Sequence, residues 1–124
     1  MGAPIVHFEI IANDSKALSA YYAELFGWHV DPDNEFNYGV VAREDNLNPQ
    51  GIGIGGGIGP AMGGGGGHVT VYAEVPDVEA SLAKAEALGG RRLFGPDKVM
   101  AGMTLGQFSD PEGHIIGLIE TVAS

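Results

Sequence analysis

Two residues near the start of the chain, His7 and Glu9, have the types and the spacing needed for acid-base chemistry. They stand two positions apart in the segment PIVHFEIIA, residues 4–12, where alternating apolar residues predict a β-strand. His7 and Glu9 therefore share one strand face. The carboxylate could act as a general base with the imidazole as its partner, if burial makes it a stronger base. The same two groups could instead form a hydrogen-bonded structural pair.

A second strand contains a comparable set of polar side chains. Residues 68–75 alternate in the same way, and their polar face consists of His68, Thr70, Tyr72 and Glu74. If helices cover the two apolar strand faces, both polar faces line one concavity, although a sheet that merely faced water would show the same alternation. Tyr72 could donate a hydrogen bond to a ligand or stack on it. We therefore expect the ligand-binding residues to be His7, Glu9, His68, Thr70 and Tyr72.

His7, Glu9 and His68 could alternatively bind a divalent metal, since two imidazoles and one carboxylate suit a catalytic metal site. Against this, His68 stands two residues out of register with His7 in the repeat described next, which displaces it by about 6–7 Å along a strand. His29 and His114 stand beside expected turns, where side chains are usually exposed, and we expect neither to take part.

The elements that must position these residues occur twice along the chain. After the first strand, Asp14 or the residue before it can cap a helix that Gly27 ends, and Asp77 and Gly90 stand at the same places after the second strand. The two halves align with an offset of 63 residues, as from Asp14 to Asp77, which indicates one folding unit used twice. Further strands are expected at 28–31, 37–43, 51–58, 91–95, 102–108 and 114–121, with tight turns at 31–34 and 110–113.

The glycine-rich middle of the chain predicts a linker between two modules. Residues 59–67, GPAMGGGGG, separate module one, about 4–58, from module two, about 68–121, within a single domain. Glycines in the preceding strand, 51–58, suggest that something approaches its backbone closely. GIGIGG at 51–56 matches the GxGxxG pattern, but no helix follows it to bind a phosphate. A nucleotide site is therefore not expected.

Composition limits the partners that the chain can bind. Its 124 residues, 44% of them hydrophobic, suffice for one domain with its own core. Sixteen acidic and six basic residues give a formal charge of -10, which disfavours nucleic acid and anionic lipid and suits a cationic ligand, or merely keeps the surface solvated. No cysteine is present, and neither a signal peptide nor an apolar stretch of about 18 residues is recognisable. We therefore expect a cytoplasmic protein without a membrane span.

Four segments of the chain resemble the glyoxalase/bleomycin-resistance/extradiol-dioxygenase superfamily, also called vicinal oxygen chelate proteins. The segments are IVHFEII, AYYAELFGW, DVEASLAKAEALGG and SDPEGHIIGLIE, and together they extend from about Pro4 to Thr121. The HFEI opening, the FGW after the first helix and the GIGGGI strand are similar to its lactoylglutathione-lyase-related group. The resemblance implies an α+β fold in which two βαβββ modules form a curved mixed sheet around a cavity, usually completed by dimerisation or by pairing within one chain.

The resemblance also implies a metal site, most of whose ligand positions are lost here. Metal-dependent members bind a divalent ion through one ligand from the first strand and one from the last strand of each module. His7 matches the first position, but the repeat puts Thr70 at its counterpart. The position four residues after the Asp-Pro-x-Gly turn is Gly117, and the remaining one falls within the glycine-rich strand 51–58. We therefore expect no metal or other cofactor, with His7 as the ligand if a metal does bind, and dioxygenase activity is disfavoured.

These observations predict metal-independent binding of a small organic ligand, for which a cationic group would suit the acidic chain. The alternative is a lyase or isomerase of the same superfamily that uses Glu9 and His7 as acid and base or holds a metal through a non-standard ligand set. A third interpretation is an interaction module with a vestigial cavity. Open sheet edges and apolar surface on two small modules predict a homodimer.

Overall fold

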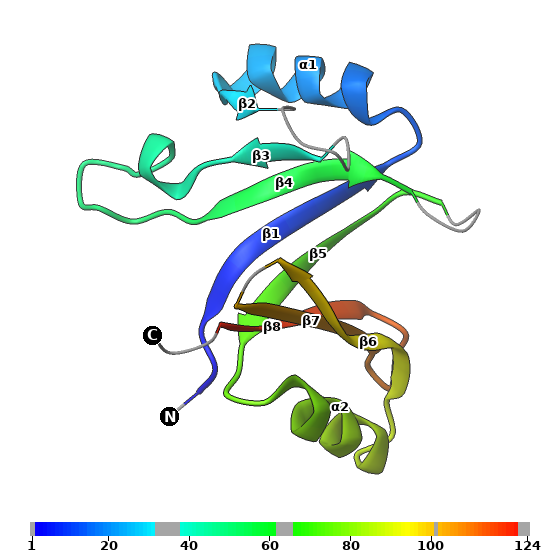
Figure 1. The fold of residues 1–124 in the computed structure, drawn as a ribbon. Helices are drawn as coiled ribbons and strands as arrows, with labels where there is room; N and C mark the ends of the chain where they lie inside the picture. Colours follow the sequence, from blue (N-terminus) through cyan, green and yellow to red (C-terminus); the bar gives the residue numbers. More distant parts are fainter. Residues whose placement is uncertain (1, 32–37, 62–65, 101, 122–124) are drawn as a thin grey trace. The chain divides into compact units, whose positions relative to one another are not determined.

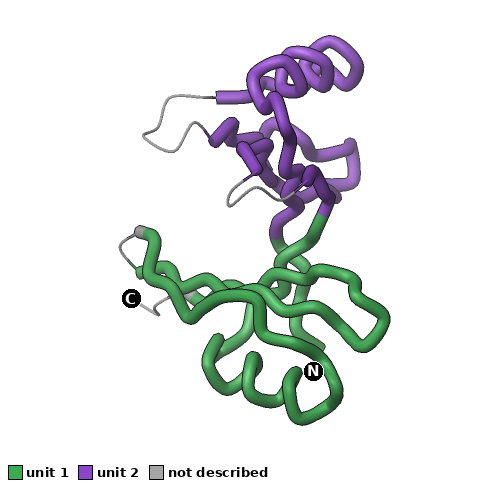
Figure 2. Tube along the Cα trace, turned by 90° about the vertical axis from the view of Figure 1, so that its right-hand side faces the viewer, with its two compact units in different colours: residues 1–6, 70–124 green, residues 7–69 purple. Residues whose placement is uncertain are grey.

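The computed structural model describes residues 2–31, 38–61, 66–100 and 102–121 and divides into two compact units (Figures 1 and 2). The N-terminal unit consists of residues 7–69, and the C-terminal unit of residues 1–6 and 70–124 (Figure 2). The expected turn at 31–34 and most of the five-glycine run fall outside the described residues. Among those described, no helix combines the length and the apolar character that crossing a membrane requires.

Each unit has the order strand, helix and three strands, so the expected α+β fold with its repeated βαβββ module is confirmed (Figure 1). In the N-terminal unit β4 runs parallel to β1, and antiparallel pairs complete the order β2-β3-β4-β1. In the C-terminal unit β5 and β8 are parallel, and the order is β5-β8-β7-β6. The N-terminal elements are β1 (Ile5–Ala12), α1 (Ser15–Phe26), β2 (Val30–Asp31), β3 (Gly39–Val41), the 3-10 helix η1 (Arg43–Asp45) and β4 (Gly55–Pro60). The C-terminal elements are β5 (His68–Glu74), whose first two residues belong to the N-terminal unit, α2 (Val78–Ala87), β6 (Arg91–Met100), β7 (Met103–Ser109) and β8 (Ile115–Thr121).

Both predicted helix caps are present. The side chain of Asp14 accepts a hydrogen bond from the backbone N–H of Ala17 at 3.0 Å, and Asp77 accepts one from Ala80 at the same distance. Gly27 ends α1 in the left-handed conformation, with φ 71°.

The glycine that ends α2 in a left-handed conformation is one residue earlier than the repeat predicts. Gly89, not Gly90, has the positive φ of 102°. Gly90 instead donates its N–H to the carbonyl of Ala85 at 2.8 Å, and a Cβ there would lie 2.8 Å from the carbonyl oxygen of Ser109. The second glycine is therefore required by close packing, while the first makes the turn.

The strand β4 begins later than predicted. The side chain of Asn48 accepts a hydrogen bond from the N–H of Ile52 at 2.9 Å, which closes a loop before the strand and leaves Ile52 68% exposed. At its far end, β4 continues through Gly59 and Pro60, which pair with Ile11 and Ala12 of β1. The prediction that a linker starts at residue 59 was therefore wrong, because these two residues belong to the sheet.

The core of the C-terminal unit forms where α2 lies against its strands. Val78 and Leu82 are fully buried beside Leu118 of β8. Gly106 of β7 makes the close approach possible, since a Cβ there would lie 2.8 Å from Val78 Cγ1 and 3.0 Å from Leu82 Cδ1. Ala73, Val75 and Phe108 pack around this core. The predicted apolar face of β5 is confirmed for its last residues, whereas Val69 is 69% exposed.

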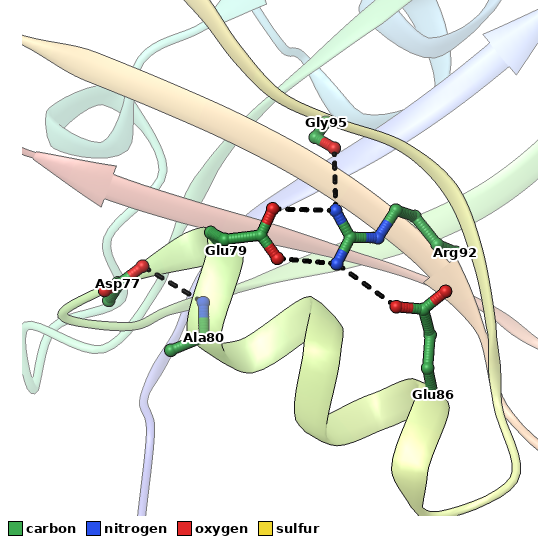
Figure 3. Close-up of polar contacts among 6 residues, drawn as sticks. All are labelled: Asp77, Glu79, Ala80, Glu86, Arg92 and Gly95. Carbon is green, nitrogen blue, oxygen red and sulfur yellow. Dashed lines mark hydrogen bonds and ion pairs between the residues drawn. The ribbon is translucent and has the colours of Figure 1, made fainter.

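Arg92 of β6 forms ion pairs with two glutamates of α2 (Figure 3). Its guanidinium group donates to both carboxylate oxygens of Glu79, at 2.9 and 2.6 Å, to Glu86 at 3.1 Å and to the carbonyl of Gly95 at 3.4 Å. The hydrogen bond from Arg92 holds the pKa of Glu79 below its ordinary value. The forked contact with Glu79 joins α2 to β6 in a geometrically specific way.

In the N-terminal unit α1 is held by aromatic packing, and none of its residues is buried. The centroid of the Trp28 ring lies 5.2 Å from that of Phe8 of β1, 5.5 Å from that of Tyr22 and 5.1 Å from that of Phe26. Three apolar side chains of α1, Tyr21, Leu25 and Phe26, are more than half exposed. Among the described residues of this unit, Val41 and Ile58 in its strands are the largest fully buried side chains.

The Gly106→Ala substitution is expected to lower the free energy of unfolding by about 1–3 kcal/mol, because the new methyl group would push α2 away from β7. Chemical denaturation measures the loss. Gly66→Ala is the matched control, since a Cβ at that residue meets nothing within 4 Å. An unchanged denaturation midpoint for Gly106→Ala would contradict the packing described here.

Candidate functional site

Three side chains of the N-terminal unit form a hydrogen-bonded cluster. Nε2 of His7 lies 3.0 Å from the hydroxyl oxygen of Tyr38, and that hydroxyl donates to Oε2 of Glu9 at 3.0 Å. The His7 and Glu9 side chains, predicted to work as a pair, are therefore linked through Tyr38. We call this set the His7–Tyr38–Glu9 cluster.

The alternation of β1 places this cluster on the face opposite α1. Phe8 packs through Trp28 toward the helix, so its neighbours His7 and Glu9 point to the other face, where they meet Tyr38. Tyr38 directly precedes β3, which pairs with β4, while β4 pairs in turn with β1. β1 thus supplies two of the side chains and the residue before β3 the third, with β4 between these two strands.

Glycines in β4 leave room for the aromatic rings on both faces. A Cβ on Gly57 would overlap the ring of Tyr38, and one on Gly59 would lie 2.7 Å from Tyr38 Cδ2. On the opposite face, a Cβ on Gly56 would overlap the ring of Phe8. The expectation that something approaches the backbone of this strand closely is confirmed, and the approaching groups are two aromatic rings.

Burial lowers the pKa of His7 below its ordinary value, which favours the neutral form of its imidazole. Tyr38 has one hydroxyl proton and donates it to Glu9. Its oxygen can then accept a hydrogen bond from His7 in the tautomer that has its hydrogen on Nε2. In that tautomer the cluster is a chain of two donors ending on a carboxylate, an arrangement that can hold a polar ligand or pass a proton along the chain.

The other predicted binding residues are Thr70, Tyr72 and His68. Thr70 and Tyr72 belong to the C-terminal unit and are each 3% exposed. The hydroxyl of Thr70 donates to the carbonyl of Ile115 at 2.5 Å, and that of Tyr72 accepts from Nε2 of Gln107 at 3.1 Å. His68 belongs to the N-terminal unit, where its buried Nε2 has no hydrogen-bond partner among the described residues. Ligand binding by these three residues stays a prediction.

His29 and His114 are exposed, as expected. Nδ1 of His114 lies 3.0 Å from Oδ2 of Asp110, across the predicted turn at 110–113, which Asp110 also closes by donating its N–H to the carbonyl of His114 at 2.9 Å. These contacts give Asp110 and His114 a structural role at the two ends of the turn.

No sequence pattern singled out Tyr38 as a candidate site residue. Its contact with Glu9 joins residues 29 positions apart, and such a contact leaves no local pattern. One signal was available, because a glycine-rich strand next to a strand that contains a tyrosine is typical of a ring packed against backbone.

The metal site that the resemblance implies does not fit these residues. Among the residues that the structure describes, no group of three or more His, Asp or Glu side chains is placed to hold a metal ion. Gly117 lies opposite Tyr72 in the β5–β8 ladder, and Gly57 lies opposite Glu9 in the β1–β4 ladder. A Cβ on Gly117 would lie 2.5 Å from Tyr72 Cδ2, so in both units a tyrosine ring occupies the space beside the glycine.

Comparisons with known proteins agree on the fold. The model of the glyoxalase-like domain matches residues 6–119, whereas no curated protein sequence matches the chain. Streptomyces coelicolor methylmalonyl-CoA epimerase in complex with 2-nitronate-propionyl-CoA has a similar structure, with 19% identity, a TM-score of 0.65, and coverage of 98% of this chain and 99% of the epimerase. For methylmalonyl-CoA epimerase from Mycobacterium tuberculosis the identity is 14%, the TM-score 0.62 and the coverage 96% and 88%.

A third similar structure is a glyoxalase/bleomycin resistance protein/dioxygenase superfamily member from Vibrio splendidus 12B01, with 12% identity, a TM-score of 0.62 and coverage of 96% of this chain and 99% of that one. At such identities the structural likeness concerns the fold. The match to the family model extends over nearly the whole chain and agrees with the repeated βαβββ order. This chain therefore belongs to the glyoxalase-like domain family, within the glyoxalase/bleomycin-resistance/dioxygenase superfamily.

Proposed function

We propose that this protein binds a small organic ligand without a metal ion, at the His7–Tyr38–Glu9 cluster. The observation that supports this most directly is the pair of 3.0 Å hydrogen bonds that joins the three partly buried side chains. Their geometry is set by the strands before any ligand arrives, which reduces the entropy lost on binding. Small-molecule complexes of similarly folded epimerases with CoA compounds are consistent with a ligand of this size class.

The charge of the site favours a ligand with a cationic group. Glu9 is a carboxylate acceptor and His7 is neutral, so the cluster presents negative charge. Among residues 7–69 the basic side chains are Lys16 and Arg43, against eight acidic ones. An ammonium or amidinium group would therefore be attracted, while the phosphates of a CoA compound would be repelled.

Thermal unfolding in the presence of three probes tests this proposal. Metal-free bleomycin and spermidine are cationic and methylmalonyl-CoA is anionic, and we expect a cationic probe to raise the unfolding temperature with EDTA present. Glu9→Gln should weaken that binding about tenfold or more, because it removes a charged hydrogen-bond acceptor. Glu24→Gln, which makes the same charge change at an exposed residue of α1, is the control for non-specific attraction.

Two results would contradict the proposal. One is stabilisation that EDTA abolishes and added metal restores, since the site would then depend on a metal ion. The other is an equal loss of probe binding in Glu9→Gln and Glu24→Gln, since the probes would then bind the acidic surface in general. Stabilisation by methylmalonyl-CoA alone would contradict only the cationic ligand.

A lyase or isomerase is the second candidate, and the linked donors of the cluster favour it. Glu9 could remove a proton from a carbon atom next to a carbonyl group. The Tyr38 hydroxyl, which lies beside His7, could return a proton to that carbon. The similarly folded epimerases make methylmalonyl-CoA the natural first substrate to try.

If the protein is such an enzyme, methylmalonyl-CoA incubated with it in D2O should exchange its α-proton for deuterium, as measured by NMR with EDTA present. Glu9→Gln should slow the exchange about 100-fold or more, the usual contribution of a general base. Glu24→Gln should leave the rate unchanged. Exchange no faster than without protein would reject this activity for this substrate.

We also propose that the protein is a homodimer. Large apolar side chains on α1 are more than half exposed, namely Tyr21, Leu25 and Phe26, and such patches on small domains usually mark interfaces. Light scattering should give twice the chain mass of 12.8 kDa. Leu25→Glu should shift the mass toward one chain, because a buried charge destabilises an apolar interface. A wild-type mass of one chain at micromolar concentration would contradict the dimer.

A further inference from the structure

We infer that Tyr38 and Gly57 are a matched pair which excludes a divalent metal from this site, with the Tyr38 hydroxyl standing where a metal ion would be coordinated. The inference deepens the proposed function, since it gives a structural reason for binding without metal. The resemblance to the superfamily assigns no such role to these two residues.

The first argument is the position of the hydroxyl oxygen. Nε2 of His7 and Oε2 of Glu9 each lie 3.0 Å from it, so the two atoms are no more than 6.0 Å apart. Imidazole nitrogen and carboxylate oxygen bind zinc at about 2.0–2.2 Å. Shifts of about 1 Å would therefore bring both atoms within bonding distance of an ion placed at the oxygen, but the tyrosine already occupies that point.

The second argument is the direction in which a side chain on residue 57 would point. A Cβ on Gly57 would overlap Cε1, Cζ and the hydroxyl oxygen of Tyr38. Any side chain at this position would thus enter the space between His7 and Glu9. Gly57 also lies opposite Glu9 in the β1–β4 ladder. A glutamate there would supply a third metal ligand, and only without the tyrosine ring would it have room.

The third argument comes from the C-terminal unit, where the same arrangement occurs with different strands. Gly117 of β8 lies opposite Tyr72 of β5, and a Cβ on this glycine would lie 2.5 Å from the Tyr72 ring. Tyr72 follows Glu9 by the 63-residue offset of the repeat. The hydroxyl of Tyr72 is held by Gln107 at 3.1 Å. In each repeat unit a tyrosine ring therefore occupies the space that a side chain on the glycine would need.

Four forms of the full-length chain test the inference: the wild type, Tyr38→Ala, Gly57→Glu and the double variant Tyr38→Ala/Gly57→Glu. Titration with Co2+ and Ni2+, followed by calorimetry and by the visible spectrum of Co2+, measures metal binding. The double variant should bind one ion per chain roughly 100-fold more tightly than the wild type, because it adds a carboxylate ligand and opens the site. Gly57→Glu alone should show a lower denaturation midpoint and no such gain, since its side chain meets the tyrosine ring.

Two matched controls establish which residues bind the ion. Adding His7→Ala to the double variant should abolish the gain, and Tyr38→Ala/Gly57→Gln should show little of it, because an amide is a poorer ligand than a carboxylate. If Tyr38→Ala/Gly57→Glu does not fold, Tyr38→Ala/Gly57→Asp takes its place in the titrations, because aspartate is the shorter of the two carboxylate side chains.

The inference is overturned if Gly57→Glu alone binds metal as tightly as the double variant without loss of stability. It is also overturned if a folded double variant, in both its glutamate and aspartate forms, binds no more tightly than the wild type. A third contrary result is wild-type protein, purified without chelators, that holds one metal ion per chain which His7→Ala releases. Probe binding is measured separately by thermal unfolding, so its absence would reject the proposed ligand and leave metal exclusion to the titrations.

Discussion

The close packing of aromatic rings against the glycine backbone of β4 is the constraint on which the N-terminal unit depends. Phe8 lies against Gly56 on one face, and Tyr38 lies against Gly57 and Gly59 on the other. The first contact brings β1 toward the aromatic packing that holds α1. The second sets the position of the hydroxyl that joins His7 to Glu9. A single side chain in this strand would therefore disturb the fold and the candidate site together.

The two units solve the problem of attaching a helix in different ways. In the C-terminal unit Val78 and Leu82 enter a closed core over Gly106, and Arg92 adds a forked ionic contact outside it. In the N-terminal unit the helix has no buried residue and packs through aromatic rings around Trp28. One module order is thus compatible with two kinds of packing, and the more exposed helix leaves apolar surface available for a partner.

Local interactions explain which parts of this structure could be predicted. The caps at Asp14 and Asp77 and the turn at Gly27 depend on neighbours within a few residues, so the residue types sufficed. The strand alternation correctly put His7 and Glu9 on one face. Tyr38 was missed because its role arises from pairing between strands distant in the chain. Val69 was assigned to a core face by its alternation, which cannot tell where along the strand the helix cover ends.

The pairing of Tyr38 with Gly57 also has a consequence for how this site can change during evolution. Replacing the glycine first introduces a clash, and replacing the tyrosine first breaks the link between His7 and Glu9 before any new ligand is present. The effects of the two substitutions are therefore strongly non-additive, as expected for residues in direct contact. If the pair excludes a metal as proposed, neither substitution alone would create a metal site, and both would have to be present together before one could form.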